Sequence, residues 1–153
     1  MCIRDRTFAA ARSFSIAGFS TFDIAAGTTT TIQGVISNGA SAGSLLKTDT
    51  GTLVLSGTNT YDGSTSVNAG TLRAGSAGAF GASTSFSVAS GATLDLNGFN
   101  LTFGALTGAG TVSGANTTIS GTFTPGSGTP GSSMTIGGNL AFQSGALLSL
   151  IHI

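Results

Sequence analysis

One short motif recurs along this 153-residue chain. It consists of Gly, then Thr or Asn either directly or one residue later, then an apolar residue, and the first three intervals between copies are 19, 21 and 19 residues. A period near 20 suits one coil of a β-solenoid and is too short for a helix-pair repeat or a propeller blade. The copies are Gly51-Thr52-Leu53, Gly70-Thr71-Leu72, Gly91-Ala92-Thr93-Leu94, Gly110-Thr111-Val112, Gly121-Thr122-Phe123 and Gly138-Asn139-Leu140.

Alternation of apolar and polar residues predicts the strands that such coils would contain. In segment 93–97, Leu94 and Leu96 fall on one face of an extended chain and Asp95 falls on the other. No segment carries the wide apolar stripe of an amphipathic helix, so no helix is expected. The same alternation predicts strands at 52–56, 85–89, 117–120 and 134–136.

Turns and loops are expected between these strands. Gly and Asn reach positive φ at little cost, so Asn97-Gly98, Asp62-Gly63 and Gly137-Gly138 are predicted turns. The Ala-, Gly- and Ser-rich runs 74–82 and 104–109 are predicted to be loops.

These patterns together predict an all-β solenoid of about seven coils with ~20 residues in each. Leu, Ile, Val and Phe would point inward and stack on the same residue types in neighbouring coils. Thr and Ser would face outward on the pleated surface, where β-branched Thr is favoured. A single coil buries too little apolar surface alone, so the neighbouring coils supply its stability.

The composition excludes several other classes of protein. Only 7% of residues are charged, with five Lys and Arg against five Asp, so no basic face for nucleic acid can form. Glu is absent, which argues against a coiled coil or a helical bundle. Hydrophobic residues make up 40% of the chain and the mean hydropathy is +0.39, which argues against charged disorder.

Both termini resemble translated sequencing adapter. Segments 1–6 and 148–153 can be back-translated into DNA strings that are reverse complements of each other, and both resemble the adapter of transposase-based libraries. We therefore expect 1–6 and 148–153 to be artefacts and 7–147 to be a fragment of a longer protein. Cys2 and His152, the sole Cys and His, lie in these segments, so a disulfide, a reactive thiol or a catalytic imidazole is not expected.

No targeting or membrane-spanning segment is expected in this fragment. The apolar run that begins at Phe8 is interrupted by Arg12 and is too short for the core of a signal peptide. Nowhere do the apolar residues approach the 18 or so in succession that a transmembrane helix needs.

The few titratable side chains do not predict a catalytic site. An enzyme built on a β-helix needs clustered carboxylates on one face, whereas Asp49 and Asp95 are more than two coils apart and would lie about 10 Å from each other at best. Each Asp is expected to be a solvated turn residue, and Tyr61 a packing residue. No catalytic, cofactor-binding or metal-binding residue is predicted. The titratable residues outside the adapter-like ends are Arg12, Asp23, Lys47, Asp49, Asp62, Arg73 and Asp95.

Three further local patterns do not predict a binding site. A calcium site would need a carboxylate cluster or the Gly-rich nonapeptide of β-rolls, and neither is present. Thr28 to Thr31 could begin an ice-binding ladder, but Thr-x-Thr does not recur in coil after coil. Gly108 to Gly110 and Gly126 to Gly128 lack the Lys and the following helix of a phosphate loop, so both are turns.

Residues 45–75 resemble the autotransporter-associated β-strand repeat. The segment reads LLKTDTGTLVLSGTNTYDGSTSVNAGTLRAG, and it shares the Lys, Gly-Thr-Leu, Asn-x-Tyr and second Gly-Thr-Leu of the family pattern. Asp49 stands where the family usually has Gly. Residues 7–44 and 121–147 look like an earlier and a later coil of the same kind.

The resemblance implies a right-handed parallel β-helix from the passenger of a type V secreted protein. Such a passenger is displayed on the bacterial outer membrane or released from the cell, and its partners are its own C-terminal outer-membrane barrel and the assembly machinery of that membrane. The expected function is a non-catalytic structural stalk. Two alternatives stay open: a surface for adhesion or self-association toward a host or neighbouring cell, and the scaffold of a polysaccharide-active enzyme whose site lies elsewhere.

Overall fold

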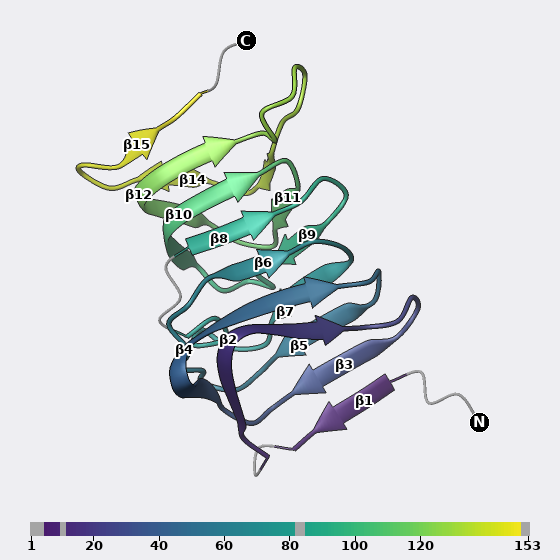
Figure 1. Ribbon diagram of the computed structural model, residues 1–153. Helices are drawn as coiled ribbons and strands as arrows, with labels where there is room; N and C mark the ends of the chain where they lie inside the picture. The colour runs from purple at the N-terminus through teal and green to yellow at the C-terminus, as the bar shows by residue number, and fades with distance from the viewer. Residues whose placement is uncertain (1–4, 10–11, 82–84, 151–153) are drawn as a thin grey trace.

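The computed structural model describes residues 5–9, 12–81 and 85–150, and all regular elements within them are β-strands in two sheets (Figure 1). The first sheet, sheet A, contains β1 (Asp5–Phe8), β3 (Thr29–Ile32), β5 (Thr52–Leu55), β7 (Thr71–Ala74), β9 (Thr93–Asp95), β11 (Thr111–Ser113) and β13 (Thr135–Gly137). The second, sheet B, contains β2 (Phe14–Asp23), β4 (Ile36–Thr48), β6 (Thr65–Val67), β8 (Ser85–Val88), β10 (Leu101–Gly108), β12 (Thr117–Pro125), β14 (Leu140–Phe142) and β15 (Leu147–Leu148).

The chain alternates between the two sheets and climbs from one coil to the next. Odd-numbered strands build sheet A, even-numbered strands up to β14 build sheet B, β15 adds to β12, and every strand pairs in parallel with the next strand of its sheet. The prediction of an all-β parallel solenoid is therefore confirmed. The stack has about six turns rather than seven, because several coils are longer than 20 residues.

The register of sheet A explains the recurring motif. Thr29, Thr52, Thr71, Thr93, Thr111 and Thr135 are successive partners, at intervals of 23, 19, 22, 18 and 24 residues. Four copies of the motif lie at these positions. The copy at Gly121 belongs instead to β12 of sheet B, and the copy at Gly138 directly precedes β14 of the same sheet. The late intervals in the sequence are irregular because they mix positions from the two sheets.

The core is built from inward-facing ranks of side chains, where a rank is a row of register partners along the stack. In sheet A, Leu53, Leu72, Leu94 and Val112 are partners in one rank, and each is fully buried. In sheet B, the ring of Phe86 packs edge-on against Phe80 and Phe103, with centroids 5.5 Å and 4.7 Å away. Stacking like on like therefore gives one continuous apolar interior.

The structure contradicts one predicted loop. Residues 104–108 belong to β10, because Leu106 points into the core and pairs with both Phe86 and Phe123. The small residues on either side of Leu106 led to the loop prediction. A strand can form there because only its inward-facing residue has to be large. The other predicted loop holds for 75–81, while 82–84 lie outside the described residues.

The predicted turns have mixed outcomes. Asn97 and Gly98 have φ of 49° and 87°, which confirms that turn. Gly63 does not have positive φ; a Cβ there would lie 2.4 Å from the carbonyl oxygen of Gly43, so close packing between coils requires the glycine. Gly137 is the last residue of β13 rather than part of a turn.

Candidate functional site

A lysine points into the solenoid at the end of β4. Lys47 is fully buried and takes the inward position between Phe22 and Val67 of the neighbouring coils. Its Nζ donates hydrogen bonds to the carbonyl oxygens of Thr48 at 2.7 Å, Asp49 at 2.6 Å and Ala69 at 3.3 Å. The ammonium group thereby joins the turn of its own coil to the turn of the next.

The surroundings of Lys47 act on its pKa in opposite directions. Loss of water on burial lowers the pKa below its usual value, while the negative charges of Asp49 and Asp23 raise it. Burial is the larger of these effects. The three carbonyl acceptors take the place of the lost hydration, as a buried charge requires.

Asp49 stands at the turn position where the resembling family has Gly. Its φ is 57°, in the left-handed region that Gly enters without strain and Asp tolerates better than most residues. Asp49 Oδ1 accepts a hydrogen bond of 2.7 Å from the backbone N–H of Thr50. This local bond explains how the turn keeps its shape without the glycine.

Asn59 links three successive coils from the interior. Its side chain is 5% exposed, its Oδ1 accepts a 2.7 Å hydrogen bond from the backbone N–H of Ile36, and its Nδ2 donates to the carbonyl oxygen of Ala79. Ile36 lies one coil earlier in the chain and Ala79 lies one coil later. Both functional groups of the amide are therefore used in bonds between coils.

Tyr61 fills the corner after β5. The residue is fully buried and its hydroxyl lies 3.0 Å from Thr65 Oγ1. Burial raises the pKa of this phenol well above 10, and the hydrogen bond with Thr65 opposes that shift. The prediction that Tyr61 is a packing residue is confirmed.

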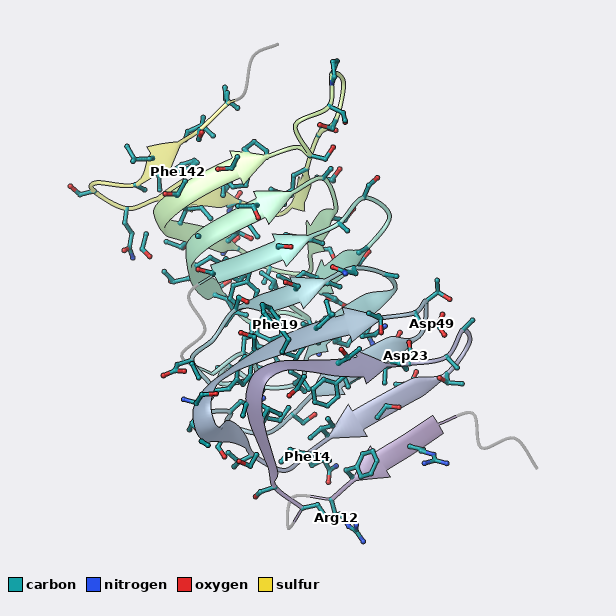
Figure 2. The ribbon with its side chains drawn as sticks, in the orientation of Figure 1. Arg12, Phe14, Phe19, Asp23, Asp49 and Phe142 are labelled. Carbon is teal, nitrogen blue, oxygen red and sulfur yellow. The ribbon has the colours of Figure 1, made fainter. Side chains whose placement is uncertain are left out.

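The remaining charged groups are dispersed over the molecule. Figure 2 shows Asp23 and Asp49 at one edge of the stack and Arg12 apart from them near its N-terminal end. Asp62 is exposed in the connection between β5 and β6. Among the described residues, no group of three or more His, Cys, Asp or Glu could hold a metal ion.

Two carboxylates outside the adapter-like ends lie in strands rather than in the expected solvated turns. Asp23 is the last residue of β2, is exposed, and accepts a 3.0 Å hydrogen bond from Thr48 Oγ1. Asp95 lies within β9, its side chain is only 15% exposed, and its Oδ2 accepts from Arg73 Nε at 2.7 Å. Its other oxygen accepts from the backbone N–H of Asn97 at 2.9 Å. Asp95 is thus a structural residue that joins two strands and the following turn.

Two hollows lie at the two ends of the described stack, where the apolar interior is open. The N-terminal hollow, about 450 Å³, is lined by residues that include Phe8, Phe14, Phe22, Ile24 and Ile32. The C-terminal hollow, about 490 Å³, is lined by residues that include Phe123, Met134, Ile136 and Leu140. Both are continuations of the apolar interior.

The outward faces carry regular rows of hydroxyl groups. In sheet B, Ser66, Ser87, Thr107 and Thr124 form one rank of partners. The sheet A threonines form another rank, as their register shows. The next outward rank of sheet A contains the Arg73–Asp95 ion pair instead of threonines. The two adjacent Thr ranks that an ice-binding ladder would need are therefore not formed on this face.

Part of the chain is similar to a known family of repeats. Residues 45–74 match the passenger-associated-transport-repeat family. This part of the chain is a passenger repeat. The repeat contains Lys47, Asn59 and Tyr61, and in this structure its characteristic polar residues face the interior.

A longer curated protein shares more of the chain. It is the adhesin BmaC autotransporter of Brucella suis biovar 1 (strain 1330), 52% identical over 90 residues, which is 58% of this chain. The chain spans only 2% of the length of that relative. No solved structure matches the chain. Within the described residues, no helix is long and apolar enough to cross a membrane.

Sequence reasoning did not identify the roles of Lys47 and Asn59. Lys47 stood in the sequence only as one of a few titratable groups, and Asn59 as one letter of the repeat. The signal that could have found Lys47 is its spacing, because it lies two residues after Leu45 and so shares the inward face of the same strand. Asn59 lies between β5 and β6, where no alternation applies.

Proposed function

We propose that this chain is a non-catalytic stalk segment of an autotransporter passenger, exposed on the outer membrane or released from the cell. One observation carries the proposal: the polar residues that characterise the repeat bind neighbouring coils rather than line a cleft. Lys47 and Asn59 use their polar groups on backbone atoms of their own and adjacent coils. Side chains whose polar groups are all hydrogen-bonded to the backbone support a scaffold, and they leave no polar group free to bind a substrate.

The similarity to a protein named as an adhesin, rather than as an enzyme, supports the non-catalytic assignment. We also propose that 7–147 is the passenger part and that 1–6 and 148–153 derive from adapter. Residues 1–4 and 151–153, including Cys2 and His152, lie outside the described residues. The proposed partner is a C-terminal outer-membrane barrel belonging to the same polypeptide.

Surface display tests the stalk. The full chain is placed between an N-terminal epitope and a heterologous outer-membrane barrel, and antibody binding to intact cells is measured. We expect strong labelling, and a several-fold loss for Leu72→Asp, which puts a charge into the core. The neighbouring outward substitution Thr71→Asp is the matched control and should label normally. Equal labelling of all three would contradict a role that depends on the folded solenoid.

A second function, self-association through the outer faces, is favoured by the uncharged hydroxyl rank of sheet B. The same cells would then sediment faster than cells that display the barrel alone. Ser66→Lys together with Ser87→Lys would place like charges on adjacent strands of this face and slow the sedimentation. Sedimentation no faster than that of barrel-only cells would rule out this function for the segment.

A further inference from the structure

The apolar and threonine ranks do not by themselves determine how the coils align. Side chains alternate between the faces with a period of two, so a strand that slips by two residues keeps its inward and outward sets. In sheet A such a slip would bring Leu55 opposite Leu72 in place of Leu53, and leucine would still stack on leucine. Other contacts must therefore select the observed register.

The Asn59 amide has partners in one register only. A slip of two residues moves a strand by about 7 Å along its axis. The 2.7 Å bond from the backbone N–H of Ile36 would then be out of reach, and so would the bond to Ala79 in a coil that slipped on the other side. Because Asn59 is 5% exposed, water could not replace these partners without opening the coil.

Lys47 depends on the same alignment of the coils. It lies near the C-terminal end of β4, whereas Asn59 binds the first residue of β4. Two of its acceptors belong to its own turn and move with it, but the Ala69 oxygen at 3.3 Å belongs to the next coil. A slip between these coils would leave the buried ammonium with fewer partners, which is unfavourable for a charge. The two side chains thus respond to the same displacement at different places in the coil.

We propose that Asn59 and Lys47 form a register lock, whose role is to select one alignment of the repeat coil on its neighbours. Selection of register is the best-supported role of isolated buried polar groups in repetitive cores. Each lost partner disfavours the slipped alignment by about 5- to 150-fold. Repetitive apolar stacking then stabilises the solenoid, and the two polar side chains select a single register.

The test distinguishes register from stability. Asn59→Leu in the full chain removes both bonds and puts an apolar side chain of similar size in place of the amide. Its backbone amide spectrum is compared with that of Leu72→Ala, which opens a cavity in the next coil but removes none of the polar groups. We expect doubled amide signals for β3 to β7 in Asn59→Leu, with a second set of about a tenth or more of the main intensity. Leu72→Ala should show one set with a lower melting temperature.

A second variant covers the case in which Asn59→Leu does not fold. Asn59→Asp keeps the acceptor for Ile36 and loses the donor to Ala79, so doubling should be confined to strands on the Ala79 side. One set of signals with native contacts in either folded Asn59 variant would overturn the proposal. Failure of both to fold while Leu72→Ala folds would also overturn it, because Asn59 would then serve general stability.

Discussion

Lys47 places a charged group in the apolar interior of the solenoid. An unpaired ammonium in such an interior would be strongly unfavourable. Three carbonyl oxygens within 3.3 Å satisfy its three donors. Those of Asp49 and Ala69 lie in turns, and that of Thr48 lies at the end of β4, where it also accepts from the backbone N–H of Ile24 at 3.3 Å. The lysine and the turn geometry therefore depend on each other.

Tyr61 provides a prediction at the scale of one hydroxyl group. Tyr61→Phe removes the bond with Thr65 and should lower the free energy of unfolding at pH 7 by about 1 kcal/mol. The folded-state pKa of the phenol is raised above its unfolded value of 10. Its contribution is therefore complete below pH 10 and is lost as the pH rises above that value.

Urea unfolding of both proteins between about pH 7 and pH 11.5 measures this difference. The advantage of the wild type should shrink above pH 10 and then reverse, because the phenyl ring of the variant has no hydroxyl group to ionise. A constant difference across this range would show that the phenol is solvated in the folded state.

The long strands of sheet B bend where their pairing register shifts. β2 and β10 are interrupted by register shifts, between Ile16 and Gly18 and between Phe103 and Ala105. Gly18 has φ of 57°, and irregularities of this kind bend a strand. Figure 1 shows β2, β4, β10 and β12 curving around one corner of the stack. Of these four strands, alternation predicted only the start of β12, at 117–120, and it did not predict that a strand continues around the corner.

The turns between sheets provide a prediction about packing. Gly70 has φ of 65°, and a Cβ on it would lie 2.4 Å from the carbonyl oxygen of Gly51 in the preceding coil. Gly91 has φ of 79° but open space around it. Gly91→Ala should destabilise by about 1 kcal/mol through backbone strain alone, and Gly70→Ala by about 3 kcal/mol or more.

Thermal and urea unfolding of the two variants gives the comparison. Since both glycines share the left-handed conformation, Gly91→Ala controls for backbone strain. Equal losses would mean that the coils separate easily enough to accommodate the extra carbon.

The whole molecule is a stack in which each coil contacts mainly its neighbours. Sheet A begins with β1 and ends with β13, and each of these has one partner strand, whereas β5 and β7 have two. The burial of leucine follows the same trend, since Leu53 and Leu72 are fully buried in the middle of the stack whereas Leu147, near its C-terminal end, is exposed. Stability should therefore vary along the stack axis.

Hydrogen exchange measures this gradient. Amides of β5 and β7 should exchange at least about tenfold more slowly than those of β13 and β14, because the end coils open without disturbing the centre. Mass spectrometry of peptides from the two regions is sufficient. Uniform protection would indicate that the whole stack opens as one cooperative unit.

The sequence by itself determined the parallel solenoid and several of its strands, because repeated alternation of small polar and apolar residues is a local property. The family pattern could also be read directly at 45–75. Only the tertiary structure decided the register, the burial of Lys47 and the links made by Asn59. Their partners, Ile36, Ala69 and Ala79, are about 20 residues away in the chain, and no local pattern specifies which coil supplies a carbonyl or an N–H. Those contacts exist only once the coils are stacked.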